Sequence, residues 1–142
     1  MKNTIIILAI LMFGLNVNAQ DGGVEVEILD VVAEWGGSVK VALFEQDGFP
    51  TTGKAIATKT VLVRDIKAKV IFENIPAGQY AIAVYQDING DDKLNRKFYG
   101  APTEPYAFSN NVFGRRGPPN FEAVTFTVES STATKLKIHL KE

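Results

Sequence analysis

The residues best suited to bind an ion lie in one short stretch, Asp87 to Asn95, which follows an apolar segment. Calcium takes about six to eight oxygen ligands, and a curling loop can present oxygens from alternate residues. The spacing here copies the first part of an EF-hand loop. We therefore predict a structural calcium ion held by Asp87, Asn89, Asp91, the carbonyl of Lys93, and Asn95 directly or through water.

This stretch lacks two features of a complete EF-hand loop. Asp92 occupies the position of a flexible Gly, and Phe98 occupies the position of the closing bidentate Glu. A carboxylate from elsewhere must complete the shell, and the candidates are Glu104, Glu122 and Asp65. We expect weak affinity, on the order of 10⁻⁴ to 10⁻³ M. The alternative is a polar hairpin turn without metal, since Asn89-Gly90 is a strong turn signal.

A second candidate site is the segment 98–121, which is rich in aromatic residues, prolines and asparagines. We predict partner contacts from Tyr106, Phe108, Asn110, Asn111, Phe113, Arg115 and Arg116. Aromatic rings beside two arginines can bind a carboxylate, a phosphate or sugar hydroxyls. The alternative is a loop folded onto the domain, with its rings in the core and its asparagines bonded to backbone. The residue types favour that packed alternative for the rings, whereas Arg115 and Arg116 are hardest to explain by packing.

No combination of residues in the sequence predicts a catalytic centre. The single histidine, His139, lies between lysines on the outward side of a predicted strand. The serines Ser109, Ser130 and Ser131 have no partner base in view. Neighbouring carboxylates, such as Glu25 with Glu27, point outward from a strand and do not resemble an acid/base pair in a cleft. We therefore expect that the protein is not an enzyme.

The elements that position these residues are expected to be strands. Alternating apolar residues predict strands near 24–32, 39–44, 55–63, 68–72, 79–85, 124–128 and 135–141. The segment 79–85 is apolar on both faces, which is typical of a central strand covered on both sides. About seven strands and no convincing helix predict an all-β, single Greek-key sandwich of the immunoglobulin or transthyretin type. Its one long loop is 98–121.

The first nineteen residues are typical of a signal peptide. Lys2 supplies the positive start, an apolar run follows from Thr4 to Leu15, and Val17-Asn18-Ala19 fits a small-residue cleavage site. We expect cleavage to leave one domain, 20–142, that is periplasmic or extracellular, with no membrane span. The chain has no cysteine and a formal charge of −1. It therefore offers no disulfide, thiolate metal site or strong overall field toward nucleic acid.

Two runs of residues resemble known families. The run from Phe72 to Asp87 resembles the Pro-Gly-x-Tyr turn and strand of transthyretin-like and carboxypeptidase-regulatory-like sandwich modules. The longer run from Asp87 to Glu122 resembles a family of secreted bacterial proteins of unknown function with an Asp-x-Asn-Gly-x-Gly-Lys-Leu-Asp loop followed by Gly-Phe-Ser-Asn-Asn. This chain departs from that pattern at Asp92, Asn95 and Ala107. The resemblance implies an exported sandwich and carries no activity with it.

These observations favour an exported, non-enzymatic β-sandwich that binds a protein or glycan of the cell envelope through 98–121. The Asp87 loop would stiffen that surface, with calcium as its one expected ligand and no other cofactor. A purely structural accessory module of the envelope is the first alternative. A hydrolase of unfamiliar type is the second.

Overall fold

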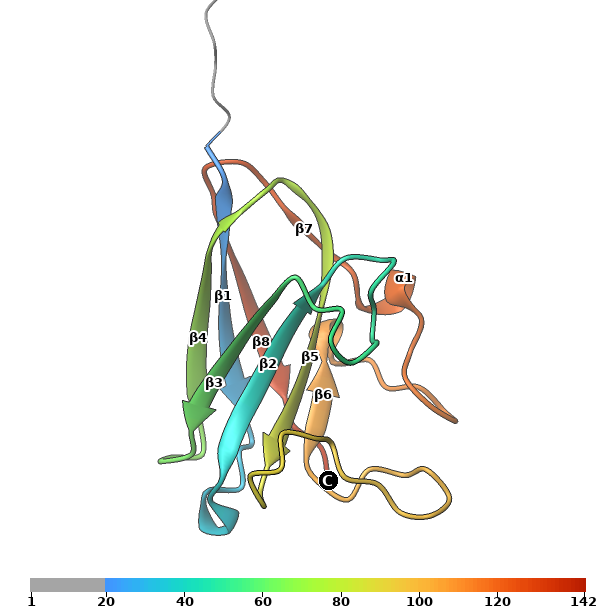
Figure 1. Ribbon diagram of the computed structural model, residues 1–142. Coiled ribbons are helices and arrows are strands. Elements are labelled where there is room, and N and C mark those ends of the chain that lie inside the picture. The colour runs from blue at the N-terminus through green and yellow to red at the C-terminus, as the bar shows by residue number, and fades with distance from the viewer. Residues whose placement is uncertain (1–19) are drawn as a thin grey trace, which may run out of the picture.

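The computed structural model describes residues 20–142, in which eight strands form two facing sheets (Figure 1). The predicted signal peptide lies outside the described residues. One sheet has the order β4–β1–β8 and the other β3–β2–β5–β6, with β7 also paired to β5. The strands are β1 (Gly22–Leu29), β2 (Ser38–Phe44), β3 (Ala57–Leu62), β4 (Ala68–Ile75), β5 (Gly78–Asp87), β6 (Tyr106–Phe108), β7 (Phe126–Val128) and β8 (Ala133–His139). The predicted all-β sandwich is confirmed.

Three short helical turns complete the described elements. They are η1 (Ala33–Trp35), η2 (Ser109–Asn111) and α1 (Phe121–Val124). Within residues 20–142 no helix is long and apolar enough to cross a membrane.

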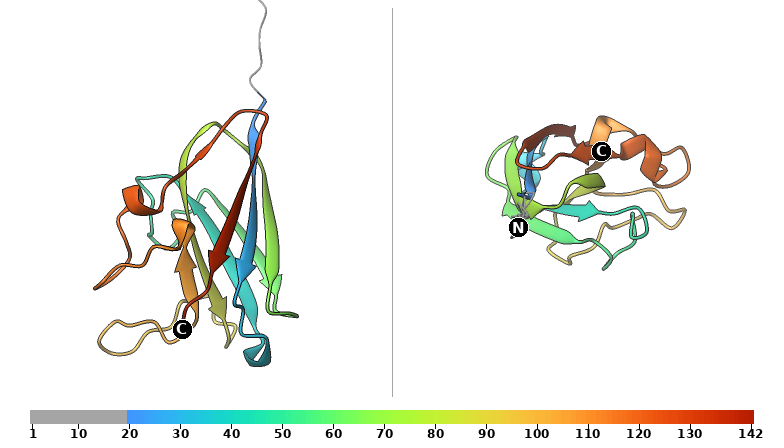
Figure 2. Two further views of the ribbon diagram at one scale, coloured as in Figure 1. Left: turned by 180° about the vertical axis from the view of Figure 1, so that it is seen from behind. Right: turned by 90° about the horizontal axis from the view of Figure 1, so that it is seen from above.

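The main core lies between the sheets because the predicted alternation directs every second side chain inward. Val24, Val26 and Ile28 of β1 are fully buried, and so are Val39 and Leu43 of β2. β1 pairs antiparallel with β4 and parallel with β8, so the two chain ends of the domain lie in one sheet (Figure 2). This core fixes the register of the strands, because a one-residue slip would turn the apolar face outward.

β5 is the central strand of the larger sheet and is covered on both faces, as its apolar sequence predicts. Its residues Tyr80, Ile82 and Val84 enter the main core. On its other face, Ala81 packs in a second hydrophobic cluster with Phe108, Phe121 and Val124. Phe49 is partly buried and packs against this cluster. The rings of Phe49 and Phe108 meet edge to face at 5.8 Å. This second cluster holds the segment after β6 against the sheet.

The segment 98–121 contains more regular structure than its sequence predicts. It includes β6, which pairs with β5, and η2 directly after it. Tyr106 and Lys141 exchange two backbone hydrogen bonds of 3.0 Å, which joins β6 to the chain just after β8. A strand of three residues is too short to produce a visible period, so the sequence pattern predicts a loop there. Two true loops remain, one before β6 and one after η2, and both project from the same side of the sandwich (Figures 1 and 2).

Candidate functional site

The Asp87 loop starts at the end of β5 and winds around one buried carboxylate. Asp87 is fully buried. Its Oδ1 accepts hydrogen bonds from the backbone N–H groups of Gly90 at 2.8 Å and Asp91 at 3.2 Å. Its Oδ2 accepts one from Asp92 N–H at 3.0 Å. Three charge-assisted bonds satisfy a buried carboxylate without a cation, so Asp87 shapes the loop.

Gly37 is required for the close approach of the neighbouring chain to this loop. A Cβ at Gly37 would lie only 2.1 Å from the carbonyl oxygen of Asp87. Its φ of +78° also lies in the left-handed region that favours glycine. The Gly36-Gly37 turn therefore packs backbone directly against the start of the loop.

The exposed part of the loop carries the other predicted ligands. Asp91 Oδ2 accepts from Asn95 Nδ2 at 2.8 Å and Asp91 Oδ1 accepts from Lys93 N–H at 3.0 Å. The hydrogen bond from Asn95, followed by that from Lys93 N–H, holds the pKa of Asp91 below its usual value. Asn89 Oδ1 accepts from Asp91 N–H at 3.2 Å. All the predicted side-chain ligands therefore lie together in one network.

Glu104 brings a second buried carboxylate into the loop from outside it. Its side chain is 5% exposed, Oε1 accepts from Ile88 N–H at 2.9 Å, and Oε2 accepts from Asn95 N–H at 3.0 Å. The other two candidates for closing the shell lie elsewhere. Glu122 accepts a hydrogen bond from Gln46 at 3.3 Å, and Asp65 accepts one from Ile66 N–H at 2.7 Å. Glu104 thus clamps both ends of the Asp87 loop.

These donors fit a calcium ion in chemistry, although the carboxylates are spread out. Carboxylate and amide oxygens are the ligands that calcium prefers. Asp87 Oδ2 and both oxygens of Glu104 accept one hydrogen bond each, so each retains a lone pair. Between residues 20 and 142, however, no three side chains of Asp, Glu, His or Cys are grouped as a metal site requires. Asp92, at the position where an EF-hand loop has a flexible Gly, has a left-handed φ of 61°, and its side chain pairs with Lys40 instead of the loop.

The residues predicted to contact a partner divide into two groups. Asn110 Nδ2 donates to the carbonyl of Thr125 at 2.9 Å. Asn111 donates to the carbonyl of Lys137 at 3.1 Å and accepts from His139 N–H at 2.8 Å, which caps the outer edge of β8. Phe113 is half-buried against Tyr106 at 5.5 Å. These three side chains make contacts within the domain, as the alternative of a loop folded onto the domain predicts.

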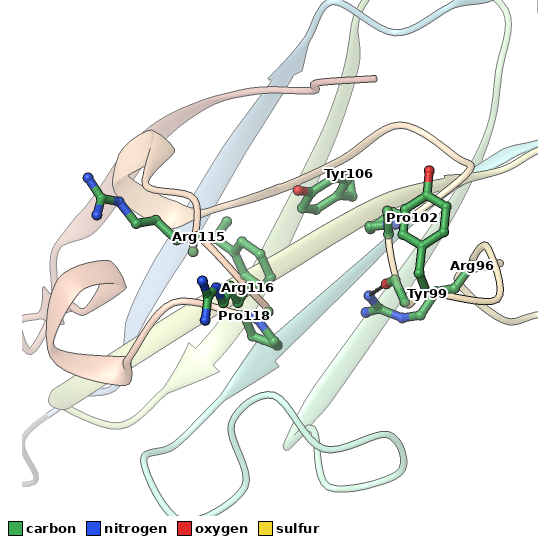
Figure 3. Close-up of a pocket in the computed structure, with 12 residues that line it drawn as sticks. Arg96, Tyr99, Pro102, Tyr106, Arg115, Arg116 and Pro118 are labelled. Atoms are coloured by element: carbon green, nitrogen blue, oxygen red, sulfur yellow. Dashed lines mark hydrogen bonds between the residues drawn. The ribbon is translucent and has the colours of Figure 1, made fainter.

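The other group lines a cleft of about 490 Å³ between the two projecting loops. Arg96, Tyr99 and Pro102 form one wall, and Arg116 with Pro118 forms the other (Figure 3). The predicted residues Tyr106, Phe108 and Arg115 also line it, and Arg115 extends away from the other labelled side chains. Arg96 Nη1 donates to the carbonyl of Gly100 at 2.9 Å.

Arg96, Tyr99, Pro102 and Pro118 are absent from the residues predicted by sequence. The signal that could have found them is charge. Residues 93–121 contain five Lys and Arg against one Glu, and that Glu is the buried Glu104. None of the five bases forms an ion pair with another residue in the part of the chain that the structure describes. The cleft therefore presents guanidinium groups that no internal carboxylate neutralises.

The family of the chain follows from comparison with known proteins. Residues 24–136 match a family model described as an uncharacterized protein conserved in bacteria (DUF2141). No curated protein and no solved structure matches the chain.

Proposed function

The chain belongs to the DUF2141 family of uncharacterized proteins conserved in bacteria, and we propose that it is an exported, non-enzymatic binding module. Its site is the cleft between the loops 96–102 and 114–118. The ligand is an anionic group, a carboxylate or phosphate, carried by a glycan or protein of the cell envelope.

The unpaired guanidinium groups on the cleft walls are the observation that carries this proposal. Arg96 and Arg116 face a space of about 490 Å³, within the ~300–1,000 Å³ typical of small-ligand sites. Guanidinium groups stay charged at all physiological pH values and bind carboxylate and phosphate in a bidentate manner. Tyr99 and Tyr106 add phenol groups beside them. These groups hold charge and donate hydrogen bonds, which suits recognition better than proton transfer.

The test is a titration with small anions followed by NMR chemical shifts. The probes are inorganic phosphate and glucuronate, with glucose as the neutral match to glucuronate. We expect shifts in residues 96–102 and 114–118 with the anions and none with glucose. Arg116→Gln should weaken binding by about fivefold or more, the loss of one charge-assisted contact. Arg64→Gln, an exposed arginine in the turn between β3 and β4, is the matched control.

Equal weakening by Arg64→Gln would show general charge attraction and contradict a built site. If neither anion shifts the cleft residues, the proposed ligand class is wrong. The structural accessory module then becomes the better proposal.

We further propose that the Asp87 loop binds calcium weakly as a structural ion. Asp87, Asn89, Asp91, Lys93 and Asn95 would hold it, with Glu104 as the additional carboxylate. The supporting observation is that Glu104, one of three carboxylates considered from the sequence, hydrogen-bonds within this loop. When bound, calcium would neutralise these carboxylates and stiffen the loop.

Calorimetry with chelator-treated protein tests the calcium proposal. We expect a Kd on the order of 10⁻⁴ to 10⁻³ M and a higher melting temperature with calcium. Asp91→Asn should remove both effects, whereas Glu122→Gln should keep them. An absence of binding heat, with a melting temperature that chelator leaves unchanged, would refute it.

A further inference from the structure

The loop before β6 carries two aromatic side chains at its outermost point. Phe98 is 101% exposed and Tyr99 is 62% exposed. Their rings meet edge to face at 5.0 Å, and Lys97 Nζ lies 5.7 Å from the centre of the Tyr99 ring. Phe98 therefore contacts little besides its neighbour in sequence. A fully exposed phenylalanine gains nothing from folding, so its presence here points to a use outside the fold.

The backbone beneath these rings is a built turn. Lys97 N–H donates to the Ala101 carbonyl at 2.8 Å, and Gly100 N–H donates to the Lys97 carbonyl at 2.8 Å. Gly100 has a φ of +93°, which glycine adopts without strain. Thr103 N–H donates to the Asn95 carbonyl at 2.9 Å and joins the turn to the loop that Glu104 clamps. The turn thus presents Phe98 in a defined place.

Bases gather next to this tip. Residues 93–121 have five bases and one acid, and that acid is the buried Glu104. Lys93, Arg96 and Lys97 flank the tip, and all three are exposed. The exposed acids Asp91 and Asp92 precede this segment, and Asp92 pairs with Lys40. The charged residues nearest the aromatic rings in the sequence are therefore bases.

We propose that this tip, Phe98 and Tyr99 with Lys93, Arg96 and Lys97, docks the protein on the surface of an anionic phospholipid bilayer. Phe98 enters the acyl boundary, Tyr99 lies at headgroup level, and the bases contact lipid phosphates. A protruding phenylalanine suits a lipid bilayer, because the acyl chains can rearrange around the inserted ring. A glycan stacks on a flat ring face, which two perpendicular rings do not jointly offer, and the unpaired bases favour an anionic surface.

Phe98 distinguishes this docking from binding in the cleft, because Phe98 does not line the cleft. Arg96 and Tyr99 belong to both surfaces, so a docked molecule holds the cleft next to the membrane. The consequence for the proposed binding module is that it meets its ligand at a bilayer surface.

Vesicle co-sedimentation tests the proposal. The probe is a vesicle of phosphatidylglycerol mixed with phosphatidylcholine, compared with phosphatidylcholine alone. The protein is purified from cells that express the full chain, and its N-terminus is determined by mass spectrometry. We expect preferential binding to the anionic vesicles that high salt removes. Phe98→Ala should lower the partition coefficient by about tenfold to a hundredfold, the effect of burying one phenylalanine. Leu62→Ala, at a 63% exposed leucine on β3, should leave it unchanged.

A second measurement locates the tip directly. In Phe98→Trp, made together with Trp35→Phe so that position 98 holds the one tryptophan of the chain, emission should shift to the blue on addition of anionic vesicles and be quenched by brominated acyl chains. The proposal is overturned if the protein does not bind these vesicles, or if Phe98→Ala binds as well as the unaltered protein with an unchanged melting temperature. It is also overturned if Arg116→Gln lowers vesicle binding as much as Phe98→Ala does, because binding would then reside in the cleft. Loss of phosphate or glucuronate binding in Arg116→Gln leaves it unaffected.

Discussion

Replacement of Glu104 by Gln tests whether a buried carboxylate holds the Asp87 loop in place. Glu104 is 5% exposed, and its two oxygens accept from Ile88 N–H and Asn95 N–H at 2.9 and 3.0 Å. Gln has nearly the same shape but presents one oxygen and one NH₂ group. One of the two backbone donors therefore faces another donor, and the second keeps a neutral acceptor.

The expected cost follows from those two bonds. Hydrogen bonds to charged groups contribute about 1.5–3 kcal/mol, roughly twice a neutral bond. Losing one such bond and weakening the other should lower the free energy of unfolding by about 2–4 kcal/mol. Relief of repulsion from Asp87 offsets little, because three backbone N–H groups already stabilise that carboxylate. Against a typical stability of about 5–15 kcal/mol, the loss is large.

Urea denaturation followed by circular dichroism measures this loss, in the presence of chelator so that calcium plays no part. Amide hydrogen exchange at Ile88 and Asn95 reports the same two bonds locally. Glu122→Gln, on α1, is the matched control and should change stability by less than about 0.5 kcal/mol. If Glu104→Gln unfolds at the same urea concentration as the unaltered protein, and both amides keep their protection, the clamp does not exist.

Three further changes test other contacts of the fold. Ser109→Ala leaves the N–H of Ile82 and the carbonyl of Val124 without their buried partner, so it should lower the free energy of unfolding by about 1–3 kcal/mol in urea denaturation. The same change at the exposed Ser130 should have little effect, and equal losses from the two changes would contradict this prediction. Asn111→Ala removes the amide that caps the edge of β8 and should speed exchange of the His139 amide, so unchanged protection would disprove the cap. The hydrogen bond from Lys69 lowers the pKa of Glu25, so Lys69→Gln should raise that pKa toward its usual value in an NMR titration. A carboxyl group whose pKa is lowered in the folded state stabilises the fold at pH values above its pKa in the unfolded chain. That stabilisation is lost as the pH falls through the pKa of the folded state. Any stability difference between the two proteins should therefore disappear in acid.

The sequence predicted the sandwich well because its strands have one solvated face. Val24, Val26 and Ile28 alternate with charged residues, and a period of two is visible over that length. The left-handed φ of 55° at Asn74, near the end of β4, gives no such visible period. Asparagine tolerates this region through its short polar side chain.

The cleft was harder to predict, because it depends on which loop residues meet. Asn110 and Asn111 have the residue types of a ligand site, but both bond to backbone from other elements. Neither partner lies within ten residues, so no local pattern could show this. Arg96 and Arg116 are separated by twenty positions and become opposite walls only after β6 pairs with β5. The excess of bases in 93–121 was visible in the sequence, but its effect depended on the burial of Glu104.

Two separate sets of hydrogen bonds anchor the two walls of the cleft, and the set that anchors the first wall lies in the Asp87 loop. The wall at Arg96 rises from the turn that Glu104 and Asp87 secure at the end of β5. The wall at Arg116 follows η2, whose Asn111 is fixed to β8. A change in the carboxylate clamp should therefore displace the first wall and the aromatic tip together, and leave the second in place. The Asp87 loop is thus best understood as the support that couples the tip to the cleft.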